Sequence, residues 1–222
     1  PVSDVQRAVA FLGLDTVRSL VLTAAILRSF EQAPKIPGFS AERLQAYTLI
    51  TAKVARRIAR TRPDAHAIAQ ECFTAGLLHD IGKLVIATSF PDAFAAFVAA
   101  RAAGEITSSC AWEREHLGFT HAEVGAYLLR LWALPTAIVE AVAFHHEPGR
   151  VPQRGFEIVG CVHVADALVD GCLPDAPCWQ GVTRTEGEAD LGYLEALGVS
   201  DQLPAWRAIA EEEARAFDQR LN

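Results

Sequence analysis

The sequence lacks any long uninterrupted run of apolar residues. The stretch VRSLVLTAAILRSF is shorter than the roughly 18 residues that a membrane-spanning helix needs, and it contains Arg18 and Arg28. No signal peptide is visible at the start of the chain. The five cysteines are odd in number and include no C-x-x-C pair, which is untypical of a disulfide framework. We therefore expect no membrane contact, no disulfides and a cytoplasmic location.

Positive charge is also scarce. The chain has 20 Lys and Arg against 27 Asp and Glu, a formal net charge of −7 and a pI near 5.5. Binding to a nucleic-acid duplex requires clustered Lys and Arg that displace phosphate counterions. The basic stretch KVARRIARTR alternates with apolar residues, a pattern typical of the solvated face of a helix. We expect no duplex nucleic acid among the partners.

Paired strand patterns joined by a hairpin turn are absent too. Apolar residues instead recur at helical spacing, beginning with segments 3–13 and 16–30. Ser40 is placed to cap a helix over 41–60, Pro91 suits the first turn of the next, and Thr120 with Glu123 has capping-box spacing. These signals predict an all-α fold. We expect a main domain over residues 1–170 and a short helical extension, 171–222, packed on it.

Histidines and aspartates stand at several of these helix ends, beside apolar segments. A buried carboxylate such as Asp166 is costly unless it is paired or bound to a cation. Neutral imidazoles and carboxylates that converge from different helices are typical of a divalent metal site in a helical bundle. Taken singly, each is more often a core residue or a helix cap. The candidate ligands are His79, Asp80, His121, His145, His146 and Asp166.

Four segments, GLLHDIGKLV, GFTHAEVGAYLLRLWALP, IVEAVAFHHEP and VHVADAL, resemble in order and spacing the HDOD domain of bacterial signalling proteins. That family is a branch of the HD superfamily of metal-dependent phosphohydrolases. The resemblance covers roughly residues 1–170. It implies an HD-superfamily-like helical bundle used as an output or scaffold module, often attached to a receiver domain. Catalytic relatives cleave phosphate esters, including cyclic di-GMP in the HD-GYP branch, and their ligands correspond to the six residues above.

The chain departs from the catalytic pattern. Tyr47 stands where those relatives have an early histidine, and a phenol with a pKa near 10 is a poor ligand at neutral pH. No GYP signature follows His145 and His146, and the family's first helices are absent. The resemblance then implies one divalent ion (Fe, Mn, Zn or Mg) held by Asp80 and the later histidines, with a second ion not expected. Lys83 would face a phosphate in an active relative, although it could equally be a helix-end cation.

Three functions follow as hypotheses. The first is a signalling module with little or no catalysis, whose partner is another signalling protein, an upstream receiver or sensor domain, or a second copy of the chain. The second is a phosphohydrolase in which Asp80 and Lys83 assist catalysis at the metal. The third is a non-catalytic sensor that binds a nucleotide or phosphate ligand.

Overall fold

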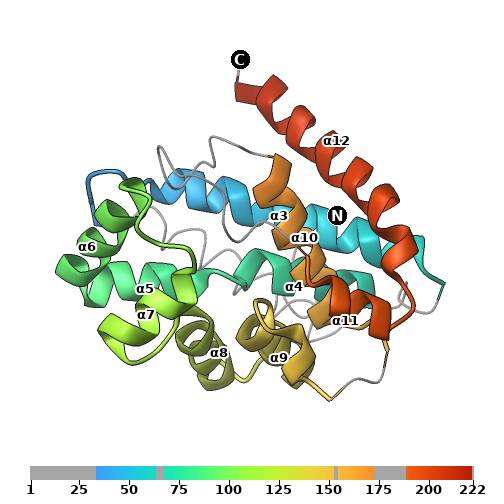
Figure 1. The fold of residues 1–222 in the computed structure, drawn as a ribbon, viewed down its shortest axis with the longest axis horizontal. Helices are drawn as coiled ribbons and strands as arrows, with labels where there is room; N and C mark the ends of the chain where they lie inside the picture. Colours follow the sequence, from blue (N-terminus) through green and yellow to red (C-terminus); the bar gives the residue numbers. More distant parts are fainter. Residues whose placement is uncertain (1–33, 64–67, 153–154, 173–188, 222) are drawn as a thin grey trace, which may run out of the picture.

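The computed structural model describes residues 34–63, 68–152, 155–172 and 189–221 (Figure 1). Within these residues the protein is all-α and contains no strand, as predicted. The segments 3–13 and 16–30, for which helices were predicted, lie outside the described residues. The α-helices are α3 (Ala41–Thr61), α4 (Ala69–Leu78), α5 (Ile81–Ser89), α6 (Pro91–Ala102), α7 (Ser109–Leu117), α8 (His121–Leu131), α9 (Thr136–Phe144), α10 (Ile158–Cys172), α11 (Leu191–Ala196) and α12 (Leu203–Leu221).

Helix α3 forms one wall of the core and packs against α4, α10 and α12. It begins as expected, because the Ser40 hydroxyl accepts a hydrogen bond from the backbone N–H of Arg43. Its inward face buries Leu44, Ile50 and Ile58 completely or nearly so. This apolar stripe, rather than helix propensity alone, holds α3 in place.

The segment from α4 to α6 turns back on itself. Pro91 occupies the first turn of α6, and the chain leaves that helix through Gly104, whose φ of 73° favours glycine. Pro91 thus acts as the sequence predicted. Among the described helices, no single one is long and apolar enough to cross a membrane, and Ala69–Ser89 with Pro91–Ala102 meets that test only as a pair bent by 118°.

Helix α12 crosses α3 and α10 (Figure 1). Arg57 of α3 pairs with Glu212 at 2.7 Å and with Glu213 at 2.9 Å. Trp206 is fully buried, stacks on Phe156, and anchors the start of the helix. These glutamates of α12 are therefore bound by an arginine of α3, although exposed pairs of this kind contribute little stability.

The His79–Asp80 pair lies at a break between helices. His79 ends α4 and Asp80 precedes α5. Two residues later, Gly82 packs so closely on α8 that a Cβ there would lie 1.9 Å from the backbone oxygen of His121. The absence of a side chain at Gly82 therefore lets α5 and the start of α8 meet, and it brings His121 beside Asp80.

Candidate metal centre

The six predicted ligands come together from four places in the chain. They are called the His–Asp cluster below: His79 and Asp80 between α4 and α5, His121 at the start of α8, His145 and His146 directly after α9, and Asp166 in α10. His121 Nε2 lies 3.3 Å from Asp80 Oδ1, and His79 Nε2 lies 3.0 Å from Asp166 Oδ1. His121 Nε2 also lies 3.1 Å from His146 Nε2. As the sequence predicted, His145 and His146 stand at a helix end, because α9 ends at Phe144.

Two histidines are oriented by backbone carbonyls. Nδ1 of His79 donates to Gly76 O at 2.7 Å, and Nδ1 of His145 donates to Val142 O at 2.8 Å. A carbonyl can only accept, so the hydrogen sits on Nδ1 in both rings. Nε2 of each neutral ring therefore turns its lone pair toward the cluster.

His121 is oriented by Glu113, which the sequence analysis missed. The Glu113 carboxylate is buried, with 2% of the residue exposed; it accepts from His121 Nδ1 at 2.7 Å and from the His121 backbone N–H at 2.8 Å. A carboxylate behind a ligating imidazole fixes its tautomer and raises its basicity. Ser109, one turn earlier, is buried on the same face of α7. Because both residues are polar, the sequence does not mark this face of the helix as buried.

The free donor atoms fit a divalent cation. Nε2 of His79, Nε2 of His145 and Oδ1 of Asp80 are buried, and no hydrogen bond of good geometry satisfies them. One ligand atom from each of these three residues lies within 4.8 Å of the other two. Burial, with a contribution from His79, lowers the pKa of His145 to about 3, so that its imidazole is neutral at physiological pH. The cluster is thus compatible with metal binding.

Internal donors already occupy one oxygen of each carboxylate. The Tyr47 hydroxyl donates to Asp166 Oδ1 at 2.8 Å, and the Lys83 ammonium lies 2.7 Å from Asp80 Oδ2. Burial, then the Asp166 charge, raises the pKa of Tyr47 well above 10, so the phenol keeps its proton. For Lys83 the sequence left two roles open, a group that faces a phosphate in an active relative or a helix-end cation, and its ammonium contacts Asp80.

Opposing effects set the charges in this region. Burial raises the pKa of Asp80, but Lys83, His79 and His121 lower it more, and the carboxyl stays ionised. Burial lowers the pKa of His79, whereas Asp80 and Asp166 raise it more, so the net shift is upward. A protonated His79 can therefore act as a counter-ion between the two carboxylates.

His163, in α10, makes its hydrogen bonds outside the carboxylates of the cluster. Its Nδ1 donates to His145 O at 2.7 Å, and its Nε2 accepts from the backbone N–H of Asp190 at 2.8 Å. Both ring nitrogens are thus used elsewhere, and Asp166 instead contacts Tyr47 and His79. His163 instead ties the end of α9 to the chain before α11.

A pocket of about 640 Å³ adjoins the cluster at His146. Its wall includes Cys110 from α7, two arginines and two glutamates. Each arginine is paired: Arg114 with Glu123 and Arg150 with Glu147, both at 2.9 Å. The pocket therefore carries balanced charge rather than a cationic patch for a phosphate.

Comparison with known proteins gives one family match. The model of the HDOD domain matches residues 1–148. It includes Tyr47 and the cluster as far as His146, but it stops before Asp166. An HDOD domain protein of unknown function from Geobacter sulfurreducens is 26% identical, with a TM-score of 0.63 over 96% of this chain and 76% of that one.

Three further relatives are more distant. A predicted phosphohydrolase of Shewanella amazonensis SB2B is 24% identical (TM-score 0.60, covering 97% of this chain and 77% of that one), and a predicted signal transduction protein of Marinobacter aquaeolei VT8 is 21% identical (0.65, 93% and 46%). At these identities the likeness shows the fold. An uncharacterized protein of Treponema pallidum (strain Nichols) is 24% identical over 177 residues, which are 77% of this chain and 33% of that protein. The chain thus spans about a third of the length of that curated relative.

Proposed function

Since this chain belongs to the HDOD domain family, we propose that it is a regulatory module of bacterial signal transduction that acts through protein or ligand contacts and has little or no catalytic turnover. The observation that supports this is the occupation of the carboxylates by internal donors. Tyr47 holds Asp166 and Lys83 holds Asp80, so a cation on that side would have to compete with a hydroxyl and an ammonium. A two-metal clamp on attacking and leaving oxygens needs both ions.

The internal donors also explain how the cluster can be stable when its metal positions are not all filled. A buried carboxylate without a counter-charge costs several kcal/mol, by order of magnitude. Lys83 supplies that charge to Asp80 from within the chain, and the Tyr47 hydroxyl holds Asp166. The fold of a signalling module then does not depend on filling every metal position.

The test is the hydrolysis of bis(p-nitrophenyl) phosphate by purified protein with Mn²⁺, Fe²⁺, Zn²⁺ or Mg²⁺ added in turn. We expect the wild type to be no faster than the matched Asp80→Asn variant, which preserves volume but removes the charge at the centre of the cluster. Turnover in the wild type that disappears in Asp80→Asn would overturn the proposal. The Tyr47→His variant places an imidazole beside Asp166, and we expect it to bind more metal per chain than the wild type.

A metal-dependent phosphohydrolase is the second candidate. The observation in its favour is the set of bare donors on His79, Asp80 and His145, which point into the cluster although they are buried. A divalent ion held there with His121, His146 and Asp166 would supply Lewis-acid charge to a phosphate ester. In that case Lys83 would orient Asp80, and the same assay would show turnover that depends on both residues.

Protein partners are part of the first proposal. An upstream receiver or sensor domain, another signalling protein, or a second copy of the chain would receive or deliver the signal. Sedimentation of the purified chain tests the copy, since a concentration-dependent dimer would support it and a monomer throughout would leave the other two.

A further inference from the structure

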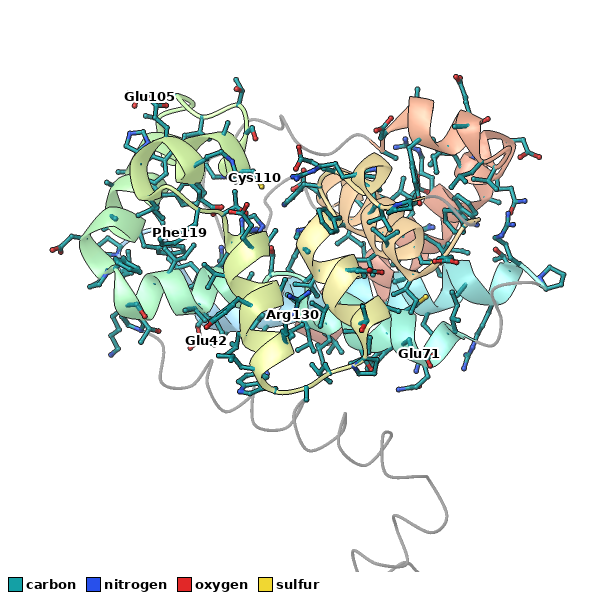
Figure 2. All side chains as sticks on the ribbon, turned by 90° about the horizontal axis from the view of Figure 1, so that it is seen from below. Glu42, Glu71, Glu105, Cys110, Phe119 and Arg130 are labelled. Carbon is teal, nitrogen blue, oxygen red and sulfur yellow. The ribbon has the colours of Figure 1, made fainter. Side chains whose placement is uncertain are left out.

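Three soft donors meet at the edge of the His–Asp cluster that adjoins the pocket. Cys110 lies in the first turn of α7, His121 begins α8, and His146 follows α9. One ligand atom from each lies within 4.8 Å of the other two. Cys110 and His146 also line the pocket of about 640 Å³. Figure 2 shows Cys110 on the side of α7 that faces the middle of the molecule, whereas Glu105, in the loop before that helix, lies at the outer edge.

The two imidazoles are already arranged for a shared ligand. His121 Nδ1 donates to Glu113, so a neutral His121 ring has its lone pair on Nε2. That atom lies 3.1 Å from His146 Nε2, and the hydrogen between them must then come from His146. A cation that takes the place of this hydrogen would face two basic nitrogens at once.

We propose that Cys110, His121 and His146 form a thiolate-containing site for Zn²⁺, with its fourth position open toward the pocket. Zinc bonds to nitrogen and sulfur are roughly 2.0–2.3 Å long, so tetrahedral donor atoms lie roughly 3.3–3.8 Å apart. The nitrogen pair is already within this spacing to a few tenths of an ångström, and the sulfur needs to approach by up to about 1.3 Å. On binding, the Cys110 thiol loses its proton to solvent and a zinc–sulfur bond forms.

The donor set determines the metal. A thiolate with two imidazoles favours zinc, whereas Mg²⁺ and Mn²⁺ prefer carboxylate and water oxygens. His121 Nε2 also lies 3.3 Å from Asp80 Oδ1, so it cannot fully coordinate both a zinc ion at this site and an ion bound at Asp80. Zinc at this site therefore withdraws His121 from Asp80. This proposal stands apart from the regulatory function above, because it requires neither a partner nor the absence of turnover.

The test uses Co²⁺ and Zn²⁺ added to the full chain after chelation. We expect the cobalt form to show thiolate-to-metal charge-transfer absorption in the near ultraviolet. Cys110→Ser should lose that absorption and bind Zn²⁺ roughly 100-fold more weakly or worse, since changes outside the ligand shell alone cost about 10–100-fold. The matched control, Cys172→Ser at the end of α10, should retain the absorption.

Bound cobalt without a thiolate band in the wild type, or unchanged Zn²⁺ affinity in Cys110→Ser, would overturn the proposal. Visible d–d absorption of bound cobalt that is lost in His79→Ala but kept in Cys110→Ser would place the ion at Asp80 and overturn the proposal equally. If Cys110→Ser does not fold, X-ray absorption of the zinc-loaded wild type decides: sulfur scattering at about 2.3 Å supports the site, and nitrogen or oxygen scattering alone contradicts it. Phosphodiester turnover would contradict the proposed function, but it would not bear on zinc binding by Cys110.

Discussion

The two sides of the His–Asp cluster differ in how their polar groups are satisfied. On the Tyr47 side, defined as Tyr47, His79, Lys83 and Asp166, a hydroxyl and an ammonium hold the carboxylates. On the Glu113 side, defined as Cys110, Glu113, His121 and His146, a carboxylate stands behind an imidazole and directs its Nε2 forward. The Tyr47 side carries its own counter-charges, whereas the Glu113 side presents donors to an added cation. Asp80 lies between the two, with one oxygen toward each.

The difference has a thermodynamic consequence. Metal bound only by the folded protein adds RT ln(1 + [L]/Kd) to the free energy of unfolding, about 2.7 kcal/mol at 100 times Kd. The Tyr47 side should contribute its stability with or without metal. The Glu113 side should contribute a part that appears on adding metal and disappears with chelator. Variants on the two sides therefore separate these contributions.

The largest effect is expected at Asp80, because it joins both sides. Asp80→Ala leaves the buried Lys83 ammonium without its carboxylate at 2.7 Å, and breaking a buried pair in this way costs about 3–5 kcal/mol. Urea denaturation with and without Zn²⁺ measures the loss. Asp92→Ala, at an exposed position in the first turn of α6, is the control and should change the free energy of unfolding by less than about 1 kcal/mol. Equal losses in the two variants would mean that Asp80 does not join the sides.

Gly82→Ala should disturb the Glu113 side through the backbone. The new Cβ would lie 1.9 Å from the His121 carbonyl oxygen and 2.7 Å from its carbon, so α5 and α8 must separate. Overpacking of this kind costs about 1–3 kcal/mol, and the displaced His121 should weaken Zn²⁺ binding as well. Gly149→Ala, where a Cβ meets nothing within 4 Å, is the matched control. Calorimetric unfolding and zinc titration of both variants check this, and an unchanged zinc affinity in Gly82→Ala would contradict it.

Sequence patterns predicted most of the fold because caps and apolar periodicity act locally. The Thr120–Glu123 capping box forms as expected, and Ser40 starts α3. The metal ligands could be predicted together only through the resemblance to a family. The division at residue 170 stays a prediction.

The roles of Glu113 and Lys83 could not be predicted from the sequence, for a different reason. Their roles depend on contacts between helices or on the direction of a side chain, and neither leaves a periodic pattern. Glu113 lies eight residues from His121, in another helix, yet it bonds that ring at 2.7 Å. From the sequence, the Lys83 side chain could face a phosphate or end a helix, and in the fold its ammonium contacts Asp80.

Glu113→Gln tests the support behind His121. The amide oxygen can still accept from Nδ1, but the negative charge that raises the basicity of the imidazole is lost. We expect Zn²⁺ affinity to fall by about 10–100-fold, with a small effect on unfolding in chelator. Glu115→Gln, an exposed position on the same helix, is the control for lost charge, and it should bind Zn²⁺ like the wild type. Competition with a chelating dye measures both, and equal affinities would remove Glu113 from the metal site.

The smallest effect is expected at Tyr47, and it should appear on the Tyr47 side alone. Tyr47→Phe preserves the ring, which is 7% exposed, and removes the hydroxyl that donates to Asp166 at 2.8 Å. A hydrogen bond of this kind contributes about 0.5–1.5 kcal/mol net, and His79 Nε2 still lies 3.0 Å from the same oxygen. Urea denaturation should show this loss equally with and without Zn²⁺, because the hydroxyl does not contact the Glu113 side. A loss that depends on zinc would mean that the two sides are coupled through Asp80. The Tyr47 side and the Glu113 side would then form a single cooperative centre rather than two independent parts.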